Sequence, residues 1–257
     1  MYTRKSWIVL IAAFALTLGL AACGDEEEEA APSETVQEEG VQGSGNVVTQ
    51  EMDFDDFTAV DVHNAFVVEI IQSDSFSVTI RVDDNILDLL DVSTVGDTLR
   101  IRLQRGVSLR GDVTLEADIT MPELDALKLS GAARASVSGF QSTGQLDIGL
   151  SGASTLDGDL EAGSIDLDTS GASRVDLVGS ATALTLEGSG ASTLDLADFA
   201  VDTADVTLSG ASEATVNVQE RIEPADVSGA SRLRYLGDPS LGDVTTSGAS
   251  TVDKIGD

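Results

Sequence analysis

Acidic residues stand two positions apart at several places in the chain, and this spacing permits two kinds of chemistry. Asp157 with Asp159 and Asp166 with Asp168 are examples. Because residues two apart on a strand lie on one face, such carboxylates could serve as acid and base in glycoside hydrolysis or bind Ca²⁺. Acidic residues are common throughout the sequence, however, and nothing distinguishes one pair from the rest. We therefore predict no catalytic residue, no metal site and no cofactor.

A serine nucleophile is the other chemistry to consider. Such a nucleophile needs a base next to its hydroxyl, most often a histidine. The only histidine is His63, and we expect it to be a surface side chain with none of the repeated serines described below beside it. Those serines occur in seven equivalent copies, which makes no mechanistic sense for a nucleophile. The sequence therefore predicts a protein that is not an enzyme.

Three arginines share one position of the same repeat and could bind an anionic glycan. If the copies stack, these arginines are spaced about two copies apart, or roughly 10 Å. The alternative is that each arginine pairs with a neighbouring carboxylate, an interaction that contributes little at a surface. The candidate ligand strip consists of Arg134, Arg174 and Arg232.

The only cysteine, Cys23, follows a segment that is typical of export. Arg4 and Lys5 precede fourteen residues without a charge, 7–20, and this run is shorter than the roughly 20 residues that span a bilayer. A positive start, a short apolar core and small residues before a cleavage point predict a secretory signal peptide over residues 1–22.

The ending Leu20-Ala21-Ala22-Cys23 resembles the lipobox of bacterial lipoproteins. The resemblance implies that the signal is cut before Cys23 and that the cysteine carries a diacylglycerol, usually with a third acyl chain such as palmitate. The alternatives are an ordinary signal peptide and an uncleaved anchor, but a free thiol would be a liability in an oxidising compartment. Gly24 directly after the cysteine resembles the pattern of lipoproteins that a two-membrane bacterium sends on to its outer membrane. The predicted first partner is therefore the membrane, through lipid on Cys23.

Residues 23–45 are acidic, with Pro, Ser and Gly and almost no large apolar side chain. Such a composition cannot bury enough surface to offset the entropy of ordering, so it predicts a disordered tether. Without the signal peptide the chain holds 12 basic and 45 acidic residues, a formal charge of −33. This balance argues against nucleic acid and against anionic lipid surfaces as partners. It is compatible with cationic partners, divalent ions or salty surroundings.

An internal repeat decides the fold class. The tripeptide Ser-Gly-Ala occurs seven times, at spacings of 21, 19, 19, 20, 19 and 19 residues. In six copies the next residue is Ser, and Ala133 is the exception. Because Gly permits tight backbone geometry, we interpret each copy as a corner between two strands. The corners are Ser130-Gly131-Ala132, Ser151-Gly152-Ala153, Ser170-Gly171-Ala172, Ser189-Gly190-Ala191, Ser209-Gly210-Ala211, Ser228-Gly229-Ala230 and Ser247-Gly248-Ala249.

Apolar residues flank each corner, three residues before its first Ser and five after; in the third copy they are Leu167 and Val175. Polar residues alternate with them, which predicts half-buried strands. One copy cannot bury its own apolar row, so the copies must stack as a solenoid. We predict an all-β fold, a right-handed parallel β-helix with coils of about 19–21 residues over residues 122–257. Lys254 stands where other copies have an apolar residue, and it predicts a terminal coil.

The segment 46–121 lacks the tripeptide but is also rich in strand patterns. Residues 83–90 predict one or two helical turns. Two interpretations stay open for this segment, namely irregular first coils continuous with the β-helix or a small β-rich cap on it. The expected strands cover residues 65–72, 76–82, 98–103 and 113–120.

These stretches resemble one bacterial family. The arrangement is similar to the putative auto-transporter adhesin, head GIN domain family of secreted and lipid-anchored proteins, over roughly residues 46–257. The resemblance implies a right-handed β-helix and an adhesive role, with no catalytic residues to transfer. The stretches that carry it are 54–62, 67–70, 85–87 and 98–101, which lead into the repeats, and 227–239, which closes them.

The sequence thus predicts an exported, lipid-anchored cell-envelope protein that acts as an adhesin or as a glycan- or protein-binding module. Many weak contacts along stacked coils would add as avidity. One alternative is a structural envelope scaffold that self-associates. Another is a polysaccharide lyase or hydrolase built on a β-helix. The ligand and the oligomeric state stay open.

Overall fold

The computed structural model describes residues 40–256 of the 257-residue chain. The predicted signal peptide 1–22, the lipid site Cys23 and most of the tether lie outside the described residues. Within 40–256, no helix has the length and apolar character needed to cross a membrane.

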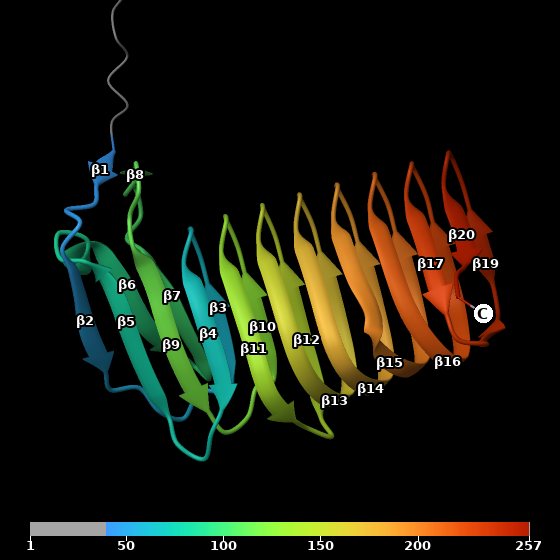
Figure 1. Cartoon of the computed structure of the whole chain (residues 1–257), viewed down its shortest axis with the longest axis horizontal. Helices are drawn as coiled ribbons and strands as arrows, with labels where there is room; N and C mark the ends of the chain where they lie inside the picture. The colour runs from blue at the N-terminus through green and yellow to red at the C-terminus, as the bar shows by residue number, and fades with distance from the viewer. Residues whose placement is uncertain (1–39, 257) are drawn as a thin grey trace, which may run out of the picture. The chain divides into compact units, whose positions relative to one another are not determined.

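The described chain winds into a stack of coils (Figure 1) whose strands pair in parallel. Four long strands each run from one Ser-Gly-Ala corner to the next, and the bend within each strand separates two sheet faces. Thr155, Arg174 and Thr193 occupy equivalent places in successive strands, so the coil length equals the sequence repeat. The predicted all-β solenoid is confirmed. The four strands are β13 (Thr155–Thr169), β14 (Arg174–Gly188), β15 (Thr193–Leu208) and β16 (Glu213–Val227).

Shorter strands continue both faces at either end of this central stack. In the last coil, Lys254 lies in register with Tyr235 and its Nζ donates to Asp238 Oδ1 at 3.1 Å. A solvated charge therefore takes the place of a core residue, as expected for a terminal coil. These strands are β10 (Ala126–Leu129), β11 (Arg134–Gln141) and β12 (Gln145–Leu150) on one side, and β17 (Arg232–Leu236), β18 (Ser240–Leu241), β19 (Val244–Thr246) and β20 (Thr251–Lys254) on the other.

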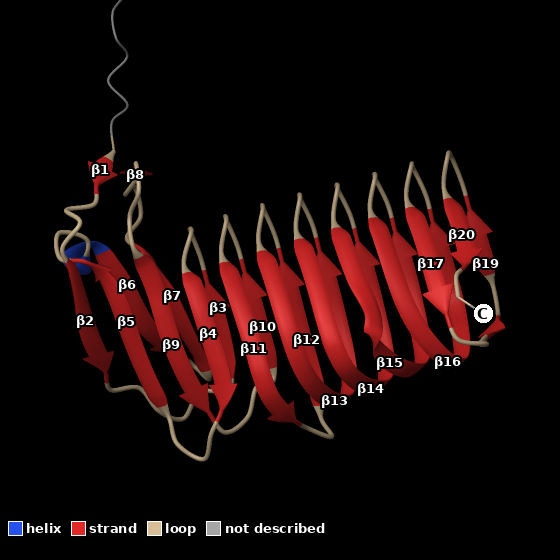
Figure 2. Ribbon diagram, in the orientation of Figure 1, coloured by secondary structure: helices blue, strands red, loops and turns tan. Residues whose placement is uncertain are grey.

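The segment 46–121 contributes both coils and a cap, which combines the two interpretations. Strands β3 (Ala59–Val62) and β4 (Val67–Gln72) pair in parallel with β10 and β11. Strands β7 (Thr98–Leu103) and β9 (Leu115–Met121) form the next coil outward. Beyond it the pairing is antiparallel. The antiparallel strands are β2 (Val47–Met52), β5 (Ser77–Asp83) and β6 (Leu90–Val95), and Figure 2 shows the 3₁₀ helix η1 (Leu87–Leu89) beside them.

Residues 40–45, which the composition assigns to the disordered tether, are ordered, so that boundary is wrong. Strand β1 (Val41–Gln42) pairs with β8 (Leu109–Arg110). Asp83, only 1% exposed, accepts the N–H of Gly45 at 2.5 Å and that of Thr114 at 2.8 Å. Composition could not reveal this, because the partners are 38 and 31 residues away in the sequence.

The core of the β-helix includes two apolar rows that flank the corners. Leu167, Leu186 and Val206 stack in register on one side of the corner row, and Val175, Leu194 and Ala214 stack on the other. All six are buried. The rows open only in the last coil, where Val244 is 38% exposed.

In every Ser-Gly-Ala corner but the last, the fourth residue is buried, whereas the Ala before it is exposed. Ser173 and Ser192 are buried, and their Oγ atoms donate to the carbonyl of the first Ser of the same corner at 2.8 and 2.9 Å. Each such bond closes its turn and satisfies a polar atom inside the coil.

Candidate functional site

The Ser-Gly-Ala corners form a single row along one edge of the solenoid (Figure 1). From the second copy on, each corner Ala N–H donates to the carbonyl of the Gly in the preceding corner, as in Ala191 to Gly171 at 2.7 Å. The corner glycines have positive φ, 76° at Gly190. The row is therefore a backbone ladder edged by exposed small side chains.

An eighth corner, which we call the hidden corner, lies in the coil that precedes the first Ser-Gly-Ala copy. It was not predicted from the sequence. It consists of residues 63–66, His-Asn-Ala-Phe. Asn64 takes the glycine position with φ 66°, and its carbonyl accepts the Ala132 N–H at 2.6 Å. Asparagine tolerates this backbone region better than most residues, which is the signal that could have identified the corner.

This hidden corner brings Asp61, His63 and Ser130 together. Ser130 Oγ lies 2.5 Å from His63 Nδ1, and His63 Nε2 lies 3.0 Å from Asp61 Oδ1. Arg100 Nε holds the second oxygen of Asp61 at 3.2 Å. The expectation that no repeat serine has a histidine beside it is thus wrong. Although 67 residues separate His63 from Ser130, coil stacking places them in adjacent corners.

A shallow hollow opens beside this group. It is lined by Asp61, His63 and Ser130 together with Lys128 and Ser151. Asp61 and His63 are 15% and 35% exposed, so the imidazole is reachable from solvent while the carboxylate is largely covered.

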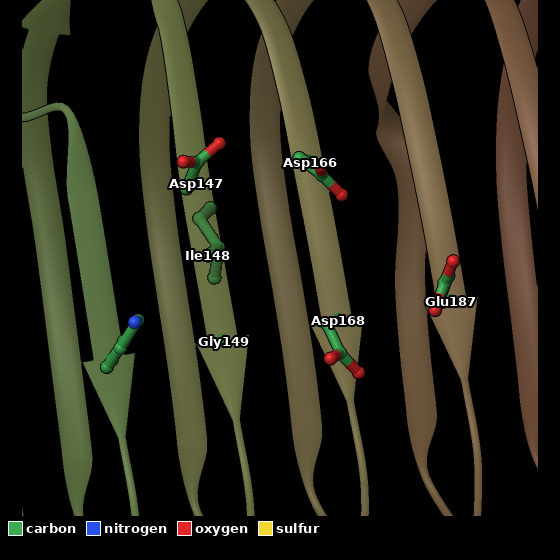
Figure 3. A pocket seen from close by; sticks show the side chains of 7 residues that line it. Asp147, Ile148, Gly149, Asp166, Asp168 and Glu187 are labelled. Carbon is green, nitrogen blue, oxygen red and sulfur yellow. The ribbon is translucent and has the colours of Figure 1, made fainter.

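The same sheet face carries a band of carboxylates on the adjoining coils (Figure 3). Asp147 lies beside Asp166, and Asp168 lies beside Glu187, on neighbouring strands. Gly149 has no side chain to fill the space between Lys128 and Asp168, so a second hollow forms there.

Farther along this face, burial and then the neighbouring Asp226 carboxylate raise the pKa of Asp205 above its ordinary 3.8. A raised pKa in the folded state means that stability is complete at low pH and falls as pH rises past 3.8. We therefore expect Asp205→Asn to increase the urea midpoint at pH 7, with the gain disappearing toward pH 3. Asp226→Asn should give a smaller gain. A midpoint for Asp205→Asn below that of the native chain at pH 7 would contradict this.

The fold places the two predicted acidic pairs on different sheet faces. Asp166 and Asp168 lie on the face with the hollows, whereas Asp157 and Asp159 pair with Asp176 and Val178 on the other face. Within residues 40–256 no three His, Cys, Asp or Glu side chains converge in a way that could hold a metal ion.

The three arginines do not form an even strip. The register places Arg134 and Arg174 two coils apart, with Thr155 between them. Arg174 and Arg232 are three coils apart, with Thr193 and Glu213 between them, so the expected spacing is wrong for this pair. Arg174 also pairs with Asp176 at 3.5 Å.

Several solved structures share this fold. One is a putative adhesin from Bacteroides fragilis, with a TM-score of 0.76 and 22% identity over 84% of this chain and all of that one. Another is a putative lipid binding protein from Parabacteroides distasonis, with a TM-score of 0.71 and 18% identity over 85% of this chain and all of that one. At these identities the likeness supports the fold alone. A comparison with curated protein sequences returned no match.

The family comparison reaches further than the structural one. The profile of one family matches residues 56–239, a span that runs from the hidden corner's strands through six of the seven Ser-Gly-Ala copies. The chain therefore belongs to the family described as putative auto-transporter adhesin, head GIN domain.

Proposed function

We propose that the chain is a lipid-anchored adhesin of the cell envelope, which binds a glycan or protein ligand along its coils without transforming it. The observation that carries this proposal is the periodic surface. Each coil repeats the same exposed corner and the same outward strand positions. A ligand with its own repeat can therefore make many weak contacts that add as avidity.

Surface charge narrows the ligand class. The formal charge of the whole chain is −31, and Asp147, Asp166, Asp168 and Glu187 crowd one face. The arginines are too widely spaced to offset these carboxylates for an anionic polymer. A neutral glycan or a basic protein surface fits this face better, since like charges disfavour encounter.

An array of neutral, acidic and basic glycans, probed with the full chain in detergent, tests the binding proposal. We expect retention on neutral polymers that rises steeply with polymer length. A combined variant with Gln at Arg134, Arg174 and Arg232 serves as the control and should bind in the same way. Absence of binding to any glycan and to any basic protein would refute the adhesin proposal.

Cys23→Ser tests the anchor. Because two or three acyl chains on Cys23 would supply the whole membrane affinity, we expect the variant to leave the membrane pellet and appear in the soluble extracytoplasmic fraction. Gly24→Ala keeps the cysteine and should stay in the pellet. Retention of Cys23→Ser in the pellet after a carbonate wash would contradict lipid anchoring.

A self-associating scaffold is the second candidate. It is favoured by the last described coil, where Leu241 and Val244 are 45% and 38% exposed and where, within residues 40–256, strands β19 and β20 pair on one side only. Light scattering of the full chain over a concentration series separates the two, since a scaffold gains mass with concentration and an adhesin keeps one mass.

A further inference from the structure

The geometry of Asp61, His63 and Ser130 points to an activity beyond adhesion. We propose that Ser130 is a nucleophile that accepts the acyl group of a small ester, with His63 as its base and Asp61 and Arg100 as positioning residues. The group combines a nucleophile, a base and an orienting carboxylate within hydrogen-bond reach, which is the arrangement of acyl-transfer sites on unrelated folds.

The carboxylate fixes the tautomer of the histidine. Asp61 can only accept, so the proton of the neutral imidazole resides on Nε2, which donates to Oδ1 at 3.0 Å. Nδ1 is then free to accept, and Ser130 Oγ donates to it at 2.5 Å. The Arg100 contact at 3.2 Å keeps Asp61 in place. In chymotrypsin, Nε2 faces the serine and Nδ1 faces the aspartate, and here the two nitrogens exchange these roles. In both arrangements the proton passes from the serine to the imidazole.

Ser130 is the one first corner serine with a histidine beside it, since His63 is the only histidine in the chain. Ser170, Ser189 and Ser228 donate to a backbone carbonyl of the preceding coil, at 3.4, 3.2 and 3.3 Å. Ser130 turns instead to the imidazole. Only this copy of the corner is therefore placed to be activated, which resolves the objection that seven equivalent nucleophiles make no sense.

The surroundings suit a small acyl ester. The hollow beside Ser130 is open to solvent and is also lined by Lys128, a cation near developing negative charge. Gly131, which follows the nucleophile, lines a different hollow together with Asn64 and Ala65. We therefore assign the stabilisation of that charge to Lys128.

The reaction balances with water as the only reactant besides the ester. His63 Nδ1 takes the Ser130 proton while the Oγ–carbon bond forms, and the ester carbon–oxygen bond breaks. The proton then passes from Nδ1 to the departing alkoxide, which leaves as an alcohol. Water releases the acyl group as a carboxylic acid and restores the serine hydroxyl.

A fluorophosphonate probe on the full chain in detergent tests the proposal, because an activated serine oxygen attacks its phosphorus, displaces fluoride and retains the phosphonyl group. Peptide mass spectrometry should find the adduct on Ser130. A base of this kind contributes roughly 100-fold or more, so His63→Ala should lower the labelling rate about 100-fold and Asp61→Asn should lower it less. Ser189→Ala, in an equivalent corner outside the hollow, should label like the native chain.

The pH profile of labelling on the unchanged chain provides a test that needs no variant. The rate should reach a plateau as pH rises, because the base that takes the serine proton is a side chain and not hydroxide. A rate that keeps rising tenfold per pH unit would mean hydroxide, not His63, is the base and would overturn the proposal. Equal labelling of His63→Ala, or an absence of adduct on Ser130, would overturn it as well. None of these outcomes bears on glycan retention, so adhesion is tested separately.

Discussion

Gly190→Ala should lower the free energy of unfolding by about 3 to 4 kcal/mol. Two costs combine at this position. The φ of Gly190 is 76°, a region that costs an L-residue roughly 1–2 kcal/mol. A Cβ would also clash with the carbonyl oxygen of Gly171 in the preceding corner. That carbonyl holds the Ala191 N–H, so relief would require breaking the ladder. Urea unfolding followed by circular dichroism measures the loss.

Gly96→Ala is the matched control for the corner glycine. Its φ is 66°, but a Cβ there would meet nothing within 4 Å. We therefore expect only the conformational cost, about 1 kcal/mol. If both variants lost the same stability, close stacking of the corners would contribute nothing beyond the backbone preference.

Phe199→Ala should cost about 3–5 kcal/mol. Phe199 is fully buried and lies in β15 opposite Gly179 of the preceding coil, where the register shifts to accommodate the one 20-residue repeat in this part of the stack. Truncation would leave a cavity between two coils, and each coil rests only on its neighbours. Thermal unfolding and urea unfolding should both show the loss.

Two further variants serve as controls for Phe199→Ala. Phe199→Leu fills most of the space and should cost about 1.5 kcal/mol or less. Val178→Ala removes a side chain that is 46% exposed in the neighbouring coil and should change stability by less than about 0.5 kcal/mol. A Phe199→Ala loss as small as that of Val178→Ala would mean that the coils close over the gap.

Most of the fold prediction rests on the repeat. Seven corners at nearly constant spacing specify the coil length, and the apolar positions around Leu167 and Val175 specify which side chains stack. Before the repeat, the alternation of apolar and polar residues alone predicted the strands. The predicted strand 98–103, for example, has the same bounds as β7. Local pattern suffices here because each coil contacts its neighbours at a fixed sequence distance.

The candidate site could not be predicted in the same way. His63 precedes Ser130 by 67 residues, because the chain leaves β4, builds the cap and returns before the first Ser-Gly-Ala copy. The spacing is therefore not a coil length, and Asn64 replaces the glycine that marks every other corner. The inward direction of the fourth corner residue also depends on hydrogen bonds such as that of Ser192, which the residue types alone do not specify.

The detour through the cap determines when the coils can form during synthesis. Strand β3 comes early in the chain, yet both of its neighbours, β7 and β10, come later. A nascent chain that emerges from its N-terminus therefore holds β3 without any partner until about residue 103, and without its second partner until about residue 129. From that point each later coil adds to a finished edge as it emerges. We infer that this protein folds in two stages, a slow closure of the first half and then rapid growth coil by coil.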